Sequence, residues 1–409
     1  DGHPEHRGST TEHFLVGVGS ILVGTNTAAY RTWDGIRGID YLCERKDIDP
    51  KKIGCTGCSG GGTLTSYIMA LDERVYCAAP ACYLTTLEKL IDTIGPQDAE
   101  QNIHAQIAFG MDQTDYVLMR APKPTLICCT TDDFFNIEGT WDTFRQSKRF
   151  YAKFGQPEQV NLVESAGKHG VTKTGREAIG RWMQRWLLGI DKDITDPGSK
   201  TWSVEDLQCT PKGQVLLIEG EKSVFDLNGE RARIFAPRRK GFAGLPLDLA
   251  RNRVRRVAGI RKLEDIPLAS FRTVGQARSE DFEIRKLVMV ADDGVSLPIL
   301  RVIPKHSKGG LTLFLSGTHK EKVLGNDLVQ EAIHDGREIW ALDLRGIGEL
   351  RHPSSNNQLG DWKTFYLSYL LEQSLVGRRT EDVINCARSV LMMEDRKMKP
   401  IEIIATDEA

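Results

Sequence analysis

The stretch Ile53-Gly-Cys-Thr-Gly-Cys-Ser-Gly-Gly-Gly-Thr63 places a single serine, Ser59, among glycines. A short apolar run at 52–56 precedes it, and a helical pattern at 63–71 follows it. Residues 57–61 fit the pattern Gly-x-Ser-x-Gly, which holds a nucleophilic serine on a sharp turn when it lies between a strand and a helix. Its glycines remove side chains that would clash in such a turn. The stretch therefore predicts that Ser59 is a nucleophile.

The same turn predicts an oxyanion donor. The backbone N–H of Gly60 lies at the start of the expected helix, where amide groups lack intrahelical partners and the helix end carries partial positive charge. Two other interpretations are a glycine-rich turn in which Ser59 only caps the helix and a phosphate-binding loop. The phosphate-binding loop is disfavoured because no Gly-Lys-Ser/Thr ending follows.

A serine hydroxyl needs a base that removes its proton, and the base needs a carboxylate that orients it. In a doubly wound hydrolase these groups follow in the order Ser, Asp, His, each at the end of a strand. The apolar run 125–130 is followed by Asp132 and Asp133, and the run 160–164 is followed by His169. We therefore expect His169 as the general base and one of the two aspartates as its orienting group.

Asp133 is the preferred carboxylate. The apolar pair Phe134-Phe135 directly follows it and would hold it in place by packing, whereas Asp132 is better placed to cap the loop. Taken alone, either aspartate could be a turn residue and His169 a surface histidine. Their positions at successive strand ends, in the order that the chemistry needs, favour a triad of Ser59, His169 and Asp133.

The composition is typical of a soluble globular protein. The chain has 409 residues, of which 40% are hydrophobic and 27% charged, and its formal net charge is -2. This charge gives no reason to expect nucleic acid or a membrane as a partner, and no apolar run approaches the roughly 18 residues of a membrane span. The opening residues 1–6 contain no signal-peptide region, so the sequence assigns no compartment.

The nine cysteines form no obvious framework, because an odd number cannot all pair in disulfides. Cys55 and Cys58 form a CxxC motif, which in other settings holds zinc. No second CxxC follows at the spacing of a zinc finger or ribbon, so we expect no metal. The chemistry assigned to Ser59 needs no cofactor.

Strand-like and helical patterns alternate over residues 24–189, which predicts an α/β fold with a doubly wound, mostly parallel sheet. The pattern weakens afterwards, although Val215 to Ile218 looks strand-like. Alternation resumes with a hairpin expected around Asp292-Asp293-Gly294. The sequence thus predicts a triad-bearing unit, a linker region and a second, incomplete α/β unit, at 1–190, 191–285 and 286–409.

These patterns resemble the α/β-hydrolase superfamily, and more narrowly bacterial acetyl xylan esterases and large esterases of the same fold. The likeness rests on five segments: 54–65 around the serine, 133–141 after Asp133, 169–186 after His169, 24–42 before the elbow, and 209–215 in the linker. It covers most of residues 1–240. It implies a metal-free serine esterase of bacterial origin, secreted or periplasmic, that acts on acetylated plant polysaccharide.

The resemblance also implies that strands are missing from the first unit. In this superfamily the second oxyanion donor follows the third strand, before the nucleophile, whereas Asp1–Pro4 resembles the loop after the fourth strand. The C-terminal part resembles what is missing: Leu311–His319 the third strand and its loop, and Asp343–Glu349 the turn after the fourth strand. Ile401–Ala409 resembles the fifth strand at an elbow without a serine.

Two arrangements could explain this division. The chain could be a fragment of a tandem hydrolase with a degenerate second unit, or a permuted hydrolase whose halves complete one sheet. We favour the fragment, because neither end resembles a natural terminus. Strands 125–130 and 311–315 would share one sheet only in the permuted arrangement.

The sequence therefore predicts a serine carboxylic-ester hydrolase that acts through an acyl-enzyme on a small-molecule or carbohydrate ester. It gives no oligomeric state. One alternative is a serine peptidase like prolyl oligopeptidase, which uses the same order of triad residues. Another is a catalytically inactive binding module with a hydrolase fold.

Overall fold

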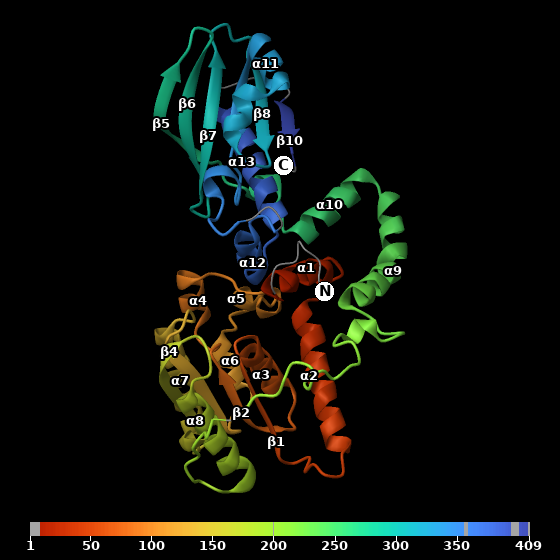
Figure 1. Ribbon diagram of the computed structural model, residues 1–409. Coiled ribbons are helices and arrows are strands. Elements are labelled where there is room, and N and C mark those ends of the chain that lie inside the picture. The colour runs from red at the N-terminus through yellow and green to blue at the C-terminus, as the bar shows by residue number, and fades with distance from the viewer. Residues whose placement is uncertain (1–8, 199, 356–358, 394–400, 408–409) are drawn as a thin grey trace. The chain divides into compact units, whose positions relative to one another are not determined.

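The computed structural model of the chain describes residues 9–198, 200–355, 359–393 and 401–407. The chain forms two compact units, Asp1–Lys240 and Gly241–Ala409, here called unit 1 and unit 2 (Figure 1). Their boundary falls inside 191–285, the stretch expected to be a linker. Asp1–Pro4, on which part of the resemblance rests, lies outside the described residues.

Unit 1 is built on a parallel sheet whose strand order, β1-β2-β3-β4, is also the chain order. Its strands are β1 (Ile53–Cys58), β2 (Val75–Ala81), β3 (Thr125–Asp132) and β4 (Val160–Lys168). Its helices are α1 (Ser9–Leu22), α2 (Thr27–Glu44), α3 (Gly60–Leu71), α4 (Leu87–Thr93), α5 (Gln106–Phe109), α6 (Gln113–Leu118), α7 (Ile137–Lys153), α8 (Lys173–Met183) and α9 (Val224–Ala243). Because all four strands are parallel, their carboxyl ends meet at one edge of the sheet.

Helices cover both faces of this sheet, as a doubly wound α/β fold requires. Along β2, Cys77 and Ala79 pack with Trp182 of α8, whereas Val75 and Ala78 pack with side chains of α3 and α7. These four β2 residues are fully buried. A strand buried on both faces tends to have a continuous apolar sequence, and residues 75–81 are mostly apolar.

The region after α8 is more structured than the sequence suggested. Helix α9 is held against α1 and α2 by Asn228, whose side chain accepts from the Tyr30 hydroxyl at 3.0 Å and donates to the Ser20 hydroxyl at 3.1 Å. The strand expected from Val215 to Ile218 is wrong, because Val215–Leu217 forms a 3-10 helix. Helix α1 was not anticipated either.

Unit 2 contains a six-stranded sheet in the order β10-β8-β9-β7-β6-β5. Its strands are β5 (Ser270–Arg278), β6 (Phe282–Val290), β7 (Ser296–Pro304), β8 (Gly310–Ser316), β9 (Arg337–Leu342) and β10 (Ile401–Thr406). Its helices are α10 (Leu247–Ala258), α11 (Asp327–His334), α12 (Trp362–Leu370) and α13 (Leu375–Met393). The hairpin prediction is confirmed: β6 and β7 pair antiparallel, and Gly294 turns the chain with φ 84°.

The sheet of unit 2 is also covered on two faces, by α13 on one and α11 on the other. Strands β3 and β8, at 125–132 and 310–316, belong to different sheets. The two halves of the chain therefore do not complete one sheet, and the permuted arrangement is wrong. None of the helices in the described ranges is long and apolar enough to cross a membrane.

Candidate active site

Ser59 lies between β1, which ends at Cys58, and α3, which begins at Gly60. Its backbone has φ 58° and ψ -120°, a conformation that costs a residue other than glycine about 1–3 kcal/mol. The Ser59 N–H donates to the Ala81 carbonyl of β2 at 3.0 Å, which ties the strained turn to the sheet. A strained serine on a strand-to-helix turn is the geometry of a nucleophile elbow.

Two glycines of this turn have no space for a side chain. A Cβ at Gly57 would lie 2.5 Å from the Gly61 carbonyl oxygen, and a Cβ at Gly62 would lie 2.4 Å from the Ala81 carbonyl oxygen. A Cβ at Gly61 would meet nothing within 4 Å. The fold therefore requires glycine at positions 57 and 62 of this turn but not at position 61.

This difference predicts opposite outcomes for two alanine substitutions. Gly57→Ala should destabilise unit 1 by about 1–3 kcal/mol, because the new methyl group forces backbone to move. Gly61→Ala, the matched control inside α3, should leave stability unchanged or raise it by up to about 1 kcal/mol. Urea unfolding followed by circular dichroism measures both. Equal unfolding midpoints for the two variants would contradict the prediction.

His169 and Asp133 are joined directly at the ends of β4 and β3. His169 Nδ1 lies 2.8 Å from Asp133 Oδ1 and 3.0 Å from Oδ2. The Asp133 side chain is 2% exposed, and it also accepts from the Phe135 N–H at 3.1 Å and the Thr130 hydroxyl at 3.3 Å. The Phe134 ring centroid lies 4.2 Å from that of the imidazole. The loop thus holds the carboxylate against the ring.

Asp132, the other candidate carboxylate, is placed differently. It is the exposed last residue of β3, and it pairs with Lys168 in the register of the sheet. The imidazole Nδ1 of His169 hydrogen-bonds to Asp133 and not to Asp132. Asp133 is therefore the aspartate in position to orient His169, as the sequence argument preferred.

Ser59 and His169 lie at the same edge of the sheet, but no hydrogen bond joins them in the part of the chain that the structure describes. Cys58 directly precedes Ser59. Its thiol lies close to the thiol of Cys82 and to the backbone of Val171, two residues after His169. Catalytic hydrogen bonds are often long without substrate and tighten in the reacting complex. The pairing of Ser59 with His169 therefore rests on their shared edge.

Cys82 is a residue of this edge that the sequence reasoning missed. It directly follows β2, as Ser59, Asp133 and His169 follow β1, β3 and β4. It has φ 50° and is 3% exposed, and its thiol donates to the Gly170 carbonyl at 3.4 Å. Burial raises the pKa of the Cys82 thiol to about 12. The rule of strand ends that located Asp133 and His169 would have located it as well.

A charged cluster, formed by the buried Glu100 and the partly exposed Arg31 and His13, lies beside the elbow. Arg31 Nη1 and His13 Nδ1 are 2.6 and 3.1 Å from the Glu100 carboxylate, whose side chain has no exposed surface. Asp98 and Glu100 raise the pKa of His13 to about 9, so its ring is protonated at neutral pH. A Cβ at Gly60 would lie 3.9 Å from Glu100 Oε1. The Glu100 carboxylate is thus paired with two cationic side chains, and we interpret this cluster as an ion-pair network.

The CxxC motif does not gather metal ligands. In the described ranges, potential ligand atoms come together in two groups, one of His13, Asp98 and Glu100 and the other of Cys82, Asp133 and His169. Cys55 is in neither group, and its thiol donates to a threonine hydroxyl of α3 at 3.7 Å. Burial raises its pKa, so it is a buried, protonated thiol.

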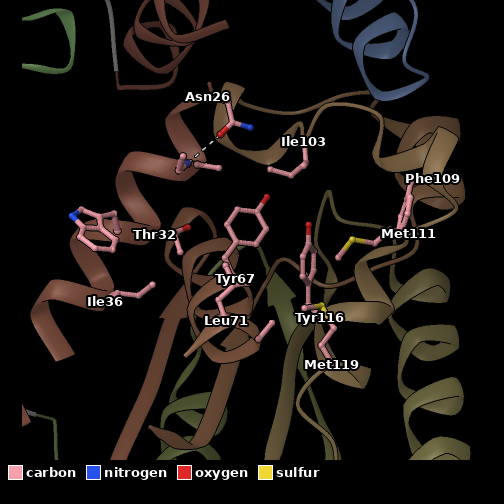
Figure 2. A pocket seen from close by; sticks show the side chains of 14 residues that line it. Asn26, Thr32, Ile36, Tyr67, Leu71, Ile103, Phe109, Met111, Tyr116 and Met119 are labelled. Atoms are coloured by element: carbon pink, nitrogen blue, oxygen red, sulfur yellow. Dashed lines mark hydrogen bonds between the residues drawn. The ribbon is translucent and has the colours of Figure 1, made fainter. Parts of the chain in front are cut away.

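An apolar cavity of about 600 Å³ lies in unit 1, lined mainly by side chains of α2, α3, α5 and α6 and the segments beside them (Figure 2). Tyr67 and Tyr116 stand next to each other in it, with ring centroids 5.0 Å apart. Large apolar cavities are the usual first candidates for ligand sites. None of the three predicted triad residues lines this one, however, so it does not locate the chemistry.

Strand β10 of unit 2 ends at Thr406, and the next residue is an aspartate. Asp407 has φ 58°, the same value as Ser59 after β1. The Asp407 carboxylate accepts from the Ser316 hydroxyl at 3.3 Å and from Lys322 Nζ at 3.2 Å. The residue after β10 is therefore an aspartate in an ion pair.

The parallel sheet, the strained serine turn and the Asp–His pair at the strand ends give unit 1 the fold of an α/β-hydrolase. Residues 23–179 match the model of the prolyl oligopeptidase family. Over 172 residues the chain is 26% identical to the Bacillus subtilis (strain 168) protein named "Putative hydrolase YtaP". The matched region covers 41% of this chain and 56% of that protein. The chain therefore spans little more than half the length of this relative.

Solved structures with partial similarity include a carbohydrate esterase family 15 glucuronoyl esterase from Caldicellulosiruptor kristjansonii, at 20% identity and a TM-score of 0.35. This match covers 42% of the present chain and 53% of the esterase. Methylesterase BT1017 matches at 26% identity and a TM-score of 0.35, over 40% of this chain and 36% of its own.

Proposed function

We propose that unit 1 is a serine carboxylic-ester hydrolase. Ser59 attacks the ester carbonyl, and His169 takes the hydroxyl proton and then gives it to the departing alcohol. Asp133 orients the imidazole, and the backbone N–H of Gly60 stabilises the oxyanion. Water then attacks the acyl-enzyme with His169 again as the base. Every protein group in these reaction steps is a side chain or a backbone amide of unit 1.

The observation that carries this proposal is the contact of His169 Nδ1 with both oxygens of Asp133, at 2.8 and 3.0 Å. An imidazole whose Nδ1–H donates to a carboxylate keeps the lone pair of its neutral form on Nε2. Nε2 is the atom that must accept the serine proton. The strained Ser59, which follows β1 of the same sheet, supplies the matching nucleophile.

The proposed substrate is an acetyl ester of a carbohydrate. This part rests on the resemblance of the motifs around Ser59, Asp133 and His169 to acetyl xylan esterases. The match of residues 23–179 to the prolyl oligopeptidase family favours a second candidate, a serine peptidase with the same triad. An ester and an amide substrate therefore separate the two proposals.

A fluorophosphonate probe tests the proposal directly. It should label the chain at Ser59, and the label should disappear in Ser59→Ala, because only an activated serine attacks the phosphorus centre. Hydrolysis of p-nitrophenyl acetate without cleavage of proline-containing peptide amides would support the esterase, and the reverse would support the peptidase. A folded chain that takes no label would be an inactive binding module.

A further inference from the structure

Three side chains at the strand ends of unit 1 form a compact set of metal-ligand atoms. The thiol of Cys82, the carboxylate of Asp133 and the imidazole of His169 each offer an atom, and these atoms lie within 4.8 Å of one another. They follow β2, β3 and β4, three adjacent strands of one sheet. The sheet itself therefore holds sulfur, oxygen and nitrogen donors around one point.

The chemistry of the three donors indicates which ion they would take. One thiol, one imidazole and one carboxylate make a mixed set of the kind that Zn²⁺ accepts in a tetrahedral site with a water molecule in the fourth position. Mg²⁺ and Ca²⁺, which prefer oxygen ligands, fit these donors poorly.

The movement needed to bind such an ion is small at two of the donors. Tetrahedral ligands at about 2.0–2.1 Å from zinc are roughly 3.3 Å apart, whereas His169 Nδ1 and the Asp133 oxygens are 2.8 and 3.0 Å apart. The pair must open by a few tenths of an ångström. The His169 side chain is 24% exposed and the Asp133 side chain 2%, so the imidazole is the group that moves to admit the ion.

We propose that Zn²⁺ binds between Cys82, Asp133 and His169, and reversibly inhibits the enzyme. Cys82 binds as the thiolate and releases its proton to solvent. The metal takes the place of the proton on Nδ1, which moves through solvent to Nε2, so the neutral ring can no longer accept the proton of Ser59. The binding part concerns these three side chains alone, whereas the inhibition rests on the proposed function.

Cobalt gives a readout of binding that does not depend on activity. Co²⁺ added to the purified, chelator-treated chain should produce a sulfur-to-cobalt charge-transfer band with one equivalent bound, and Zn²⁺ should remove it by competition. Ser59→Ala should show the same band, because Ser59 is not a ligand. Cys82→Ala should lose the band or need at least about tenfold more metal. Cys209→Ala, which removes an exposed thiol elsewhere in unit 1, should bind as the unmodified chain does.

Inhibition is measured on p-nitrophenyl acetate, with each variant compared with its own metal-free rate. Zn²⁺ should inhibit the unmodified chain and Cys209→Ala equally, chelator should restore the rate, and Cys82→Ala should need at least about tenfold more Zn²⁺ for half inhibition. The proposal is overturned if the charge-transfer band is absent, or if Cys82→Ala retains it at the same metal concentration. A band in a chain without esterase activity would keep the metal site and reject the proposed function.

Discussion

Replacing Ser59 with alanine is expected to lower kcat for p-nitrophenyl acetate by about 10⁶-fold, and Asp133→Asn by about 10⁴-fold. The alanine removes the nucleophile itself. The asparagine keeps the shape of the loop but can donate to Nδ1, which places the ring proton on Nε2 and blocks acceptance of the serine proton. Purified variants, compared with the unmodified chain by stopped or continuous assay, measure both losses.

Asp132→Asn is the matched control for this series. Its side chain is exposed at the end of β3, so the same chemical change should leave kcat within about threefold of the unmodified value. Both asparagine variants should keep the urea midpoint of the unmodified chain. If Asp132→Asn lost activity while Asp133→Asn kept it, the assignment of the orienting carboxylate would be wrong. If Ser59→Ala kept its rate, hydrolysis would use another nucleophile.

The strands and the candidate site of unit 1 could be predicted because their sequence signals are local. Strands buried on both faces appear as unbroken apolar runs, and the parallel arrangement sends every strand end to one edge. With the elbow placed at Ser59, the acid and the base of the triad are expected just after later strands, and few residues occupy such positions. Asp133 followed from its neighbours, because the phenylalanines that pack beside His169 are adjacent to it in the chain.

Other parts depend on contacts between distant residues and gave no local signal. Helix α9 is held by Asn228, whose partners Tyr30 and Ser20 are nearly 200 residues or more away. The pairing of Glu100 with His13 and Arg31 likewise joins three separate segments. Such contacts form between segments that are far apart in the sequence. A pattern of neighbouring residues therefore does not predict them.

The sequence analysis did not identify Cys82 as part of the site, for a different reason. Its position after an apolar strand was visible, but a cysteine within a run of apolar residues is usually a small buried side chain. The structure gives it a left-handed backbone with φ 50° and a hydrogen bond to the Gly170 carbonyl. Backbone strain of this kind is a property of the folded turn and has no signature in composition. The metal proposal depends on how close the Cys82 thiol lies to Asp133 and His169, and this distance comes from the structure.

Arg120 is the residue whose loss we expect to cost unit 1 the most stability. It is 5% exposed, and burial lowers its pKa. Its guanidinium donates to backbone carbonyls in α3 and at the beginnings of β2 and β3: Met69 at 3.3 Å, Val75 at 3.1 Å, Tyr76 at 3.2 Å, Lys123 at 3.0 Å and Pro124 at 2.8 Å. Each carbonyl left without a donor inside the protein costs free energy. One side chain thus satisfies several buried backbone acceptors.

Arg120→Met should lower the free energy of unfolding of unit 1 by about 2–4 kcal/mol, because the methionine fills the space but donates no hydrogen bond. The methionine also removes the cost of burying a charged group, so the free energy of unfolding falls by less than the summed contributions of the lost hydrogen bonds. Lys123→Met is the matched control, since the half-buried Lys123 side chain donates from Nζ to the Glu73 carbonyl in an exposed hydrogen bond, and it should cost less than about 1 kcal/mol. Urea unfolding gives the free energies, and hydrogen–deuterium exchange should show faster opening in β2 and β3 than in the strands of unit 2. Equal losses in the two variants would mean that Arg120 acts through its apolar bulk and not through its hydrogen bonds.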